Sequence, residues 1–299
     1  MDRIQLLEVF TAVAEAGSFA AGGRATGLSA PSVTRGINEL EERLGARLFT
    51  RTTRVVRLTD VGQTYLEEVR SILADLQAAD DLASGGAARP TGLLRITAPV
   101  EFGRIHVAPV LADFLDTYPD VSADLLTVDR VVNLVEEGID VAVRIGDLPP
   151  TGLMAVRIGY VRRVVCASPA YLKANGVPKT PQDLQSHKII SVSGISPNTE
   201  WRFGKDRDQV VRLKPRLRVS NVGAGLALAQ AGWGLTRVLS YQIGPNLQSG
   251  SLQTVLEPFE PELLPVHLVH QEGRRVTAKL RCFLDFARDR LRGVPVLSR

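Results

Sequence analysis

The sequence predicts an α/β protein of two parts, a small helical N-terminal unit with a β-wing and a larger C-terminal unit in which strands alternate with helices. Two observations carry this prediction. Apolar residues recur at helical spacing over the first 60 residues, whereas short β-branched runs alternate with helical patterns from residue 92 onward. The length of 299 residues corresponds to about two domains of average size.

Three short helices are expected first. The third shows the helical period best, because its apolar residues step by four, three and four: Val33, Ile37, Leu40 and Leu44. Ser18 and Ser29 occupy N-cap positions, and Gly45 follows the third helix as a C-cap. The predicted pattern is helix, helix, short turn, helix.

A strand pair and a long helix follow. Residues 47–59 are rich in Thr, Val and Phe and predict a small β-wing, and Thr59 and Asp60 then cap a helix that extends to about Ala83. Its apolar residues recur at heptad-like spacing: Tyr65, Leu66, Val69, Ile72, Leu73, Leu76 and Ala79. Because no globular segment adjoins this helix in the sequence, we expect it to pair with the same helix of a second chain as a short coiled coil. The alternative is packing on its own domain.

The C-terminal unit begins after a linker. Residues 84–90 have linker composition, so we divide the chain into 1–60 (winged helical domain), 61–84 (long helix), 85–91 (flexible hinge) and 92–299. Strands are expected over 93–97, 121–128, 140–145, 161–167, 188–192, 217–220, 252–256 and 266–270. Helices are expected over 107–118, 131–137, 222–231 and 276–291. Such alternation is typical of a parallel sheet with helices on both faces.

Composition and motifs exclude several classes of protein. The 44% hydrophobic and 23% charged residues are ordinary for a folded chain, which excludes wholesale disorder. Cys166 and Cys282 form no C-x-x-C pair, so neither a disulfide framework nor a structural zinc site is expected. The sequence shows no signal-peptide layout and no run of about 18 apolar residues, and we expect a cytoplasmic protein that contacts no membrane.

An enzyme is not expected either. The four histidines are scattered without metal-ligand spacing, and Gly-x-Ser-x-Gly, P-loop and dinucleotide-binding motifs are missing from the sequence. We therefore expect no catalytic residue, no metal and no cofactor.

The third helix is the first candidate site. Its apolar face leaves small, polar and basic residues on the opposite side: Ala30, Pro31, Thr34, Arg35 and Asn38. A helix of this kind after a short turn suits the major groove of DNA, where its N-terminal residues reach base edges. Five arginines follow within fifteen residues and predict phosphate contacts near the wing: Arg43, Arg47, Arg51, Arg54 and Arg57.

Several motifs occur here in a characteristic order: Leu7-Glu8-Val9-Phe10, Ala16-Gly17-Ser18-Phe19, Leu28-Ser29-Ala30-Pro31-Ser32-Val33-Thr34-Arg35, Leu48-Phe49-Thr50-Arg51 and Leu58-Thr59-Asp60-Val61-Gly62. Through them, residues 1 to about 85 resemble the winged helix-turn-helix and linker helix of LysR-type transcriptional regulators. The resemblance implies two sets of DNA contacts. Those in the major groove are Ser18, Ala30, Pro31, Ser32, Thr34 and Arg35, and those at the backbone or adjacent minor groove are Arg51, Thr53 and Arg54.

The sequence departs from the family pattern at three positions. Gln is common where Ala30 stands, so one amide that could read adenine is missing. Ala-Ala is common where Gly22 and Gly23 stand, and each glycine should cost the second helix roughly 1 kcal/mol relative to Ala.

The rest of the chain resembles the effector-binding region of the same family. The matching motifs include Glu137-Gly138-Ile139-Asp140, Cys166-Ala167-Ser168-Pro169 and Ala231-Gly232-Trp233-Gly234. The resemblance implies two α/β lobes like those of periplasmic binding proteins, joined by two crossovers. Lobe I is expected over about 92–160 and 267–292, and lobe II over about 161–266.

Ligands of such folds bind outside the carboxyl ends of strands, between the lobes. The candidate effector-binding residues are Thr97, Pro99, Val100, Glu101, Phe102, Arg144, Gly146, Ser193, Arg202, Asn221 and Val222. Glu101 has two interpretations. Its carboxylate favours a cationic or hydrogen-bond-donating ligand, or it pairs with a neighbouring arginine such as Arg144 or Arg202.

The expected function is that of a DNA-binding transcriptional regulator whose C-terminal domain senses a small-molecule effector. Its expected partners are a double-stranded DNA operator, an effector that the sequence does not identify, and copies of the same chain. The copies are expected to form a dimer through the long helix and a tetramer through the effector lobes. The alternative is a solute-binding receptor without a DNA role, which the second unit alone would predict.

Overall fold

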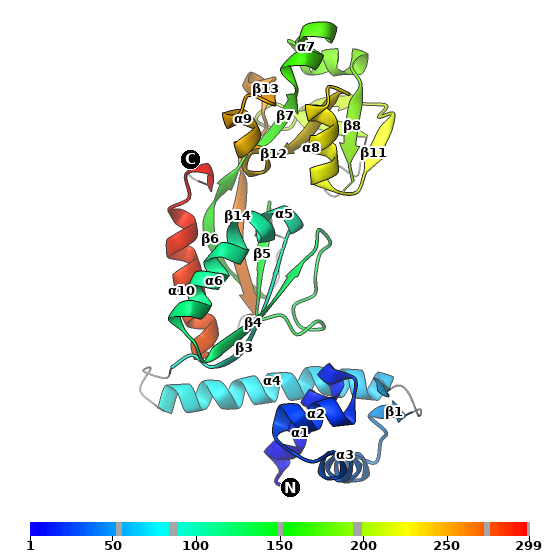
Figure 1. The fold of residues 1–299 in the computed structure, drawn as a ribbon, viewed down its shortest axis with the longest axis vertical. Helices are drawn as coiled ribbons and strands as arrows, with labels where there is room; N and C mark the ends of the chain where they lie inside the picture. Colours follow the sequence, from blue (N-terminus) through cyan, green and yellow to red (C-terminus); the bar gives the residue numbers. More distant parts are fainter. Residues whose placement is uncertain (52–55, 84–88, 149–151, 194–198, 272–275, 298–299) are drawn as a thin grey trace. The chain divides into compact units, whose positions relative to one another are not determined.

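The computed structural model describes residues 1–51, 56–83, 89–148, 152–193, 199–271 and 276–297. The chain divides into two compact units. One contains Met1–Thr91, Val135–Gly138 and Gly273–Arg281, and the other contains Gly92–Leu134, Ile139–Glu272 and Cys282–Arg299. Figure 1 labels most of the helices and strands of both.

Three helices open the chain: α1 (Arg3–Ala16), α2 (Phe19–Thr26) and α3 (Ala30–Leu44). The hydroxyls of Ser18 and Ser29 accept hydrogen bonds from backbone N–H groups in the first turns of α2 and α3. Helix α3 ends at Gly45, where a φ of 65° suits glycine and strains other residues. The predicted order of helices, both N-caps and the C-cap are confirmed.

The wing and the long helix follow as β1 (Phe49–Arg51), β2 (Val56–Leu58) and α4 (Asp60–Ala83). The two strands pair antiparallel, with Phe49 opposite Leu58. The hydroxyl of Thr59 accepts a hydrogen bond from the Gly62 N–H at 2.9 Å, which caps α4. The strand pair and the helix cap are therefore confirmed.

The core of this unit corrects the interpretation of the α4 stripe. Its buried residues come from α1, α3, α4 and the wing: Leu7, Val9, Phe10, Val13, Val33, Ile37, Leu40, Leu48, Phe49, Leu66 and Val69. Four residues of the stripe lie in or against this core: Tyr65, Leu66, Val69 and Leu73. Part of the stripe therefore packs on its own domain, as in the alternative given above, because α1 packs against α4. The pairing of α4 with a second chain stays a prediction. Ile72 and Leu76 remain 52% and 38% exposed.

Two glycines in the middle of α2 serve packing. Gly22 and Gly23 are both buried. A Cβ at Gly22 would meet Val13 Cγ2 at 2.7 Å, and one at Gly23 would meet the Leu28 carbonyl oxygen at 2.7 Å. The close approach of α2 to α1 at Gly22, and to the turn before α3 at Gly23, explains why these positions hold glycine despite its low helix propensity.

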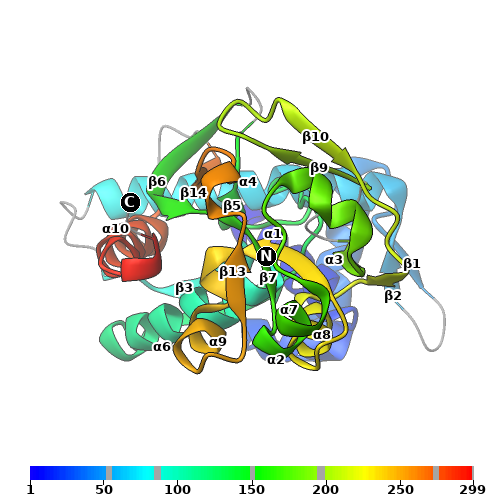
Figure 2. The same cartoon turned by 90° about the horizontal axis from the view of Figure 1, so that it is seen from above.

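Two five-stranded sheets organise the C-terminal unit. The first has the order β4 (Val121–Thr127), β3 (Gly92–Ala98), β5 (Val141–Ile145), β14 (Leu264–Gln271) and β6 (Leu153–Val161). The second has the order β11 (Leu217–Val219), β8 (Ile189–Val192), β12 (Leu235–Leu239), β7 (Arg163–Ala167) and β13 (Gln253–Val255). A separate hairpin, β9 (Glu200–Phe203) with β10 (Gln209–Arg212), runs along one side in Figure 2.

The expectation of a parallel sheet is only half right. Strand β3 is parallel to β4 and β5, but β14 is antiparallel to β5 and β6. In the second sheet, β12 is parallel to β8 and antiparallel to β7. The chain passes between the sheets from β6 to β7 and from β13 to β14. A pattern of alternating strands and helices does not reveal the direction of strands that follow one another directly.

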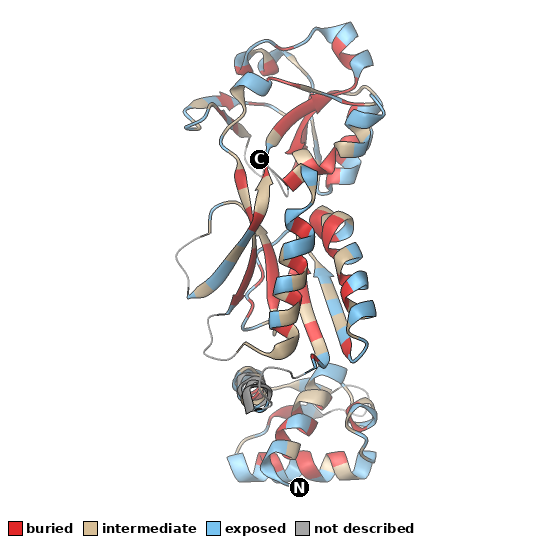
Figure 3. Ribbon diagram, turned by 90° about the vertical axis from the view of Figure 1, so that its left-hand side faces the viewer, coloured by how far each residue is buried: buried red, intermediate tan, exposed pale blue. Residues whose placement is uncertain are grey.

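Helices pack against each sheet, and buried residues concentrate between the helices and the sheet (Figure 3). Beside the first sheet lie α6 (Ala108–Thr117) and α10 (Ala278–Arg292), where the rings of Phe114 and Phe283 are 5.2 Å apart. Helix α8 (Val222–Gln230) packs against β8 and β12 of the second sheet. Two shorter helices, α7 (Pro169–Asn175) and α9 (Gly244–Gln248), belong to the same half.

The helix expected over residues 131–137 does not form. Val132 and Leu134 are buried with Ile139 and Ala142. These apolar residues therefore pack in the core from a segment without regular secondary structure. Gly138 follows with a φ of 62°, and a run of seven residues is too short to sustain a helix without tertiary support. The sequence interpretation also missed β6, the β9–β10 hairpin, β12 and α7.

Candidate functional site

Helix α3 presents a polar face that the core leaves open. Its opposite face buries Val33, Ile37 and Leu40. Of the residues predicted to contact DNA, four on α3 are exposed and two are half-buried: Ala30, Pro31, Arg35 and Asn38, then Ser32 and Thr34. Ser18 is half-buried at the start of α2. The structure therefore brings the predicted base-reading residues of α3 together on one accessible face.

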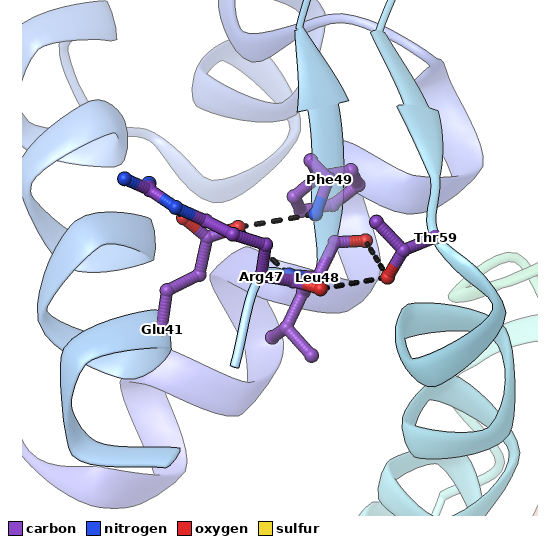
Figure 4. Close-up of polar contacts among 5 residues, drawn as sticks. All are labelled: Glu41, Arg47, Leu48, Phe49 and Thr59. Atoms are coloured by element: carbon purple, nitrogen blue, oxygen red, sulfur yellow. Dashed lines mark hydrogen bonds and ion pairs between the residues drawn. The ribbon is translucent and has the colours of Figure 1, made fainter. Parts of the chain in front are cut away.

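A buried carboxylate ties α3 to the wing (Figure 4). Oε1 of Glu41 accepts hydrogen bonds from the N–H groups of Leu48 and Phe49 at 2.8 and 3.0 Å, and Oε2 pairs with Arg47 at 2.9 Å. The Thr59 hydroxyl donates to the Arg47 carbonyl oxygen at 2.7 Å from the other side. The segment that enters the wing is thus fixed to both α3 and the start of α4.

Sequence reasoning did not select Glu41, although the sequence contained a signal. Glu41 stands one turn after Ile37 on the apolar face of α3, and a charged residue at a buried helical position needs partners. Here three groups supply them, and two are backbone donors.

The arginines around the wing are only partly described. Arg43, Arg47 and Arg57 are exposed. Arg51 ends β1, and Thr53 and Arg54 lie outside the described residues.

The C-terminal unit contains a pocket of about 330 Å³ between its two sheets. The first sheet and its loops contribute Thr97, Ala98, Pro99, Val128, Asp129, Arg130, Val131, Val132, Ala142, Val143, Arg144, Ile145, Asp147, Leu148 and Leu264. The second sheet and its helices contribute Arg163, Val222, Leu239, Tyr241 and Gln242. The segments that follow β3, β4 and β12 meet here, as expected for ligand sites at the carboxyl ends of strands.

Four of the predicted effector-binding residues line this pocket: Thr97, Pro99, Arg144 and Val222. The other seven do not: Val100, Glu101, Phe102, Gly146, Ser193, Arg202 and Asn221. The Asn221 side chain accepts a hydrogen bond from Ala224 N–H and caps α8 instead. Phe102 is fully buried against Tyr241, with 5.2 Å between ring centroids.

Glu101 pairs with an arginine, but not with either one that was named. Its carboxylate lies 2.6 Å from Nη2 of Arg104, one turn along the chain. Arg144 instead donates to the carbonyl oxygen of Val132 at 2.9 Å. Local spacing of three residues brought Glu101 and Arg104 together, and this spacing was readable in the sequence.

Several pocket residues escaped the sequence interpretation. Gln242 accepts a hydrogen bond from Leu239 N–H at 2.8 Å and donates to the Tyr241 hydroxyl at 3.2 Å. Burial raises the pKa of the Tyr241 phenol. Arg163 opens β7, where burial and the charge of Arg207 lower its pKa. An arginine that directly precedes the run Val164-Val165 was the available signal.

Membrane spans and metal clusters are both missing from the part of the chain that the structure describes. Within it, no helix combines the length and apolar character that a bilayer crossing requires. The same residues include no cluster of three or more His, Cys, Asp or Glu side chains that could hold a metal ion.

A winged helix-turn-helix unit followed by a two-sheet unit with a pocket defines a DNA-binding regulator that carries its own ligand domain. Residues 4–63 match the model for bacterial regulatory helix-turn-helix proteins of the lysR family, and residues 87–292 match the LysR substrate binding domain. The chain belongs to the LysR family of transcriptional regulators.

Its relatives are transcriptional regulators, and they align with it over most of their length. An HTH-type transcriptional regulator of Xanthomonas campestris pv. campestris is 34% identical, over 95% of this chain and 84% of the relative. An uncharacterized HTH-type transcriptional regulator of Haemophilus influenzae is 31% identical, over 94% of this chain and 98% of the relative.

Solved structures agree. CrgA, a LysR-type transcriptional regulator from Neisseria meningitidis, is 28% identical with a TM-score of 0.62, over 96% of this chain and 98% of CrgA. A full-length OxyR variant from Pseudomonas aeruginosa has a TM-score of 0.74 at 13% identity over 99% of this chain and 97% of OxyR, which shows the fold alone. The protein is thus a LysR-type DNA-binding transcriptional regulator with an effector-binding domain, and regulators of this type oligomerise.

Proposed function

We propose that the exposed face of α3 reads an operator in the major groove and that the pocket of the C-terminal unit binds the effector. The observation that supports the first part is the exposure of Arg35 at the second turn of α3, while Val33 and Ile37 on the opposite face are buried. The pocket of about 330 Å³ supports the second, since its size lies at the lower end of ordinary small-molecule sites.

We assign each function to the range expected from the sequence: DNA binding to 1–60, dimerisation to 61–84, a hinge to 85–91 and effector binding to 92–299. Ile72 and Leu76 are exposed apolar residues of α4 that a second chain would cover. Two such dimers form a tetramer through their effector domains. An effector that binds one arrangement of the lobes better shifts the population of DNA-binding arrangements. Because its target is the chromosome, we place the protein in the cytoplasm.

Gel-shift titration with the DNA upstream of the protein's own gene tests the DNA-binding surface. Replacement of Arg35 by alanine should weaken binding to the specific site by about 1–3 kcal/mol, the range for one bidentate contact to guanine. Arg54→Ala should weaken all sequences alike, as loss of a phosphate contact does. Arg218→Ala, which removes an exposed arginine of β11, is the control and should bind as the unmodified chain does. Unchanged operator affinity of Arg35→Ala would show that α3 is placed wrongly on the DNA.

A further inference from the structure

The charged side chains that line the pocket differ in how well the protein supplies them with counter-charges and hydrogen-bond partners. Among the residues that the structure describes, five charged ones line it: Asp129, Arg130, Arg144, Asp147 and Arg163. Both carboxylates have partners in the protein. Oδ1 of Asp129 accepts a hydrogen bond from the Val100 N–H at 3.1 Å, and Oδ2 of Asp147 lies 3.6 Å from Nη2 of Arg207.

Two of the arginines, Arg144 and Arg163, have weaker partners. The hydrogen bond from Arg144 to the Val132 carbonyl oxygen, at 2.9 Å, satisfies a donor but supplies no counter-charge. Nε of Arg163 is buried and has no hydrogen-bond partner within the described part of the chain. A buried donor without an acceptor costs free energy.

Arg163 also lies among other guanidinium groups. The charge of Arg207 contributes to the lowered pKa of Arg163, and the charge of Arg163 contributes, after burial, to a pKa of about 9 for Arg237. Asp147 acts in the opposite direction on Arg163. Positive charges held this close repel one another, and an anion placed beside them relieves that repulsion.

The other residues of the pocket and its volume constrain the rest of the ligand. Apolar side chains contribute much of the wall, among them Pro99, Val132, Val222, Leu239 and Leu264. A volume of about 330 Å³ limits the ligand to a small organic molecule. Val222 is also the first residue of α8.

We propose that the effector is a small organic carboxylate whose anionic group pairs with Arg163, in competition with Asp147, and whose apolar body lies against Val222 and Leu264. This inference rests on the effector-binding function proposed above. It excludes amines and places the specificity for charge on one residue at the start of β7.

A matched series of compounds on the full-length protein tests the charge. Benzoate and hexanoate, their amides, and benzylamine and hexylamine are each titrated to about 10 mM, ten times a dissociation constant of 1 mM, with calorimetric detection. The two carboxylates should bind at least roughly tenfold more tightly than their amides, because a hydrogen bond to a charged group contributes that much. Binding of the amides or amines in preference to the carboxylates overturns the inference and leaves the effector-binding function intact. Absence of binding by all six compounds also overturns the inference and leaves the effector-binding domain, which the family match shows, in place.

Variants then test the residue. Arg163→Gln should lower the affinity for benzoate at least about tenfold and leave the affinity for benzamide unchanged. Asp147→Asn should raise the affinity for benzoate, because it removes the competing carboxylate, and it keeps the test decisive if Arg163→Gln does not fold. Arg218→Gln removes an exposed arginine outside the pocket and is the control. Equal benzoate affinity in all four proteins overturns the assignment of Arg163.

Discussion

The carboxylate of Glu41 lies 2.8 Å from the backbone nitrogen of Leu48, although Glu41 belongs to α3 and Leu48 leads into the wing. Both residues are buried, and the same oxygen also accepts the N–H of Phe49. The bond therefore connects the helix proposed to read bases with the strand pair proposed to contact the backbone. The Glu41 side chain thus contributes directly to the connection between the two elements (Figure 4).

Replacement of Glu41 by alanine should loosen this connection. Two buried N–H groups would lose their acceptor, and each such loss costs about 1–3 kcal/mol. We expect faster hydrogen exchange at the Leu48 and Phe49 amides, together with a lower unfolding midpoint of the N-terminal unit. Glu42→Ala, which removes the exposed neighbouring carboxylate, is the matched control and should change neither. Unchanged exchange in Glu41→Ala would show that other groups hold the wing.

Gly62 in the first turns of α4 should not tolerate a side chain. A Cβ there would collide with the carbonyl oxygen of Leu48, a residue that the Glu41 contact holds in place. Alanine usually stabilises a helix by about 1 kcal/mol relative to glycine, but Gly62→Ala should destabilise the N-terminal unit instead. Thermal unfolding measures the sign directly. Gly244→Ala in α9, where the added Cβ would meet nothing within 4 Å, is the control for the substitution itself. A raised midpoint for Gly62→Ala would contradict the packing described here.

Local signals in the sequence predicted the N-terminal unit well, because its helices begin and end on side chains or glycines with a fixed role. Ser18, Ser29 and Gly45 act on backbone groups a few residues away, so no knowledge of the tertiary fold was needed. The α4 stripe could not be interpreted in the same way. Its partner α1 lies some 50 residues away, as the ion pair between Glu15 and Arg70 shows, and periodicity does not name the partner of an apolar face.

The pocket was predicted in position and only in part by residue. Strand ends gave Thr97 and Arg144, because the carboxyl ends of parallel strands meet at one edge. Arg163 and Tyr241 come from the second sheet and its connections, and only the crossovers of the chain bring them to the same space. The spacing of residues along the sequence does not predict that these two residues reach the same pocket. For Glu101 the pairing with a neighbouring arginine was expected, but the arginines named for it were wrong, since its partner stands one turn away along the chain.

The buried His106 should make the stability of the C-terminal unit depend on pH. Its ring lies 4.8 Å from that of Phe102 and 5.6 Å from that of Tyr241, and burial lowers its pKa. The unfolded chain takes up a proton near the ordinary value of about 6.5, which the folded protein resists. Stability from the neutral ring is therefore complete above about pH 6.5 and decreases as the pH falls below that value.

His106→Phe keeps an aromatic ring and removes the titration. The loss of unfolding midpoint between about pH 7.5 and about pH 5.5 should be smaller in this variant than in the unmodified protein. It should not vanish, because burial also lowers the pKa of His187 and His267. Equal losses in both proteins would show that His106 is protonated in the folded state as readily as in the unfolded chain.

The exposed part of the α4 stripe should decide oligomeric state. Tyr65, Leu66, Val69 and Leu73 are occupied within their own chain, so a second chain can gain most from Ile72 and Leu76, four residues apart on one face. Aspartate at both positions would place two charges in the proposed interface, where each lacks a partner and must be desolvated. Analytical ultracentrifugation should show that this double variant dissociates to monomers at concentrations where the unmodified protein is associated. Gln63→Glu adds a negative charge on the far side of the same helix, nine residues from Ile72, and should leave association unchanged. An intact oligomer in the double variant would assign dimerisation to a surface other than α4.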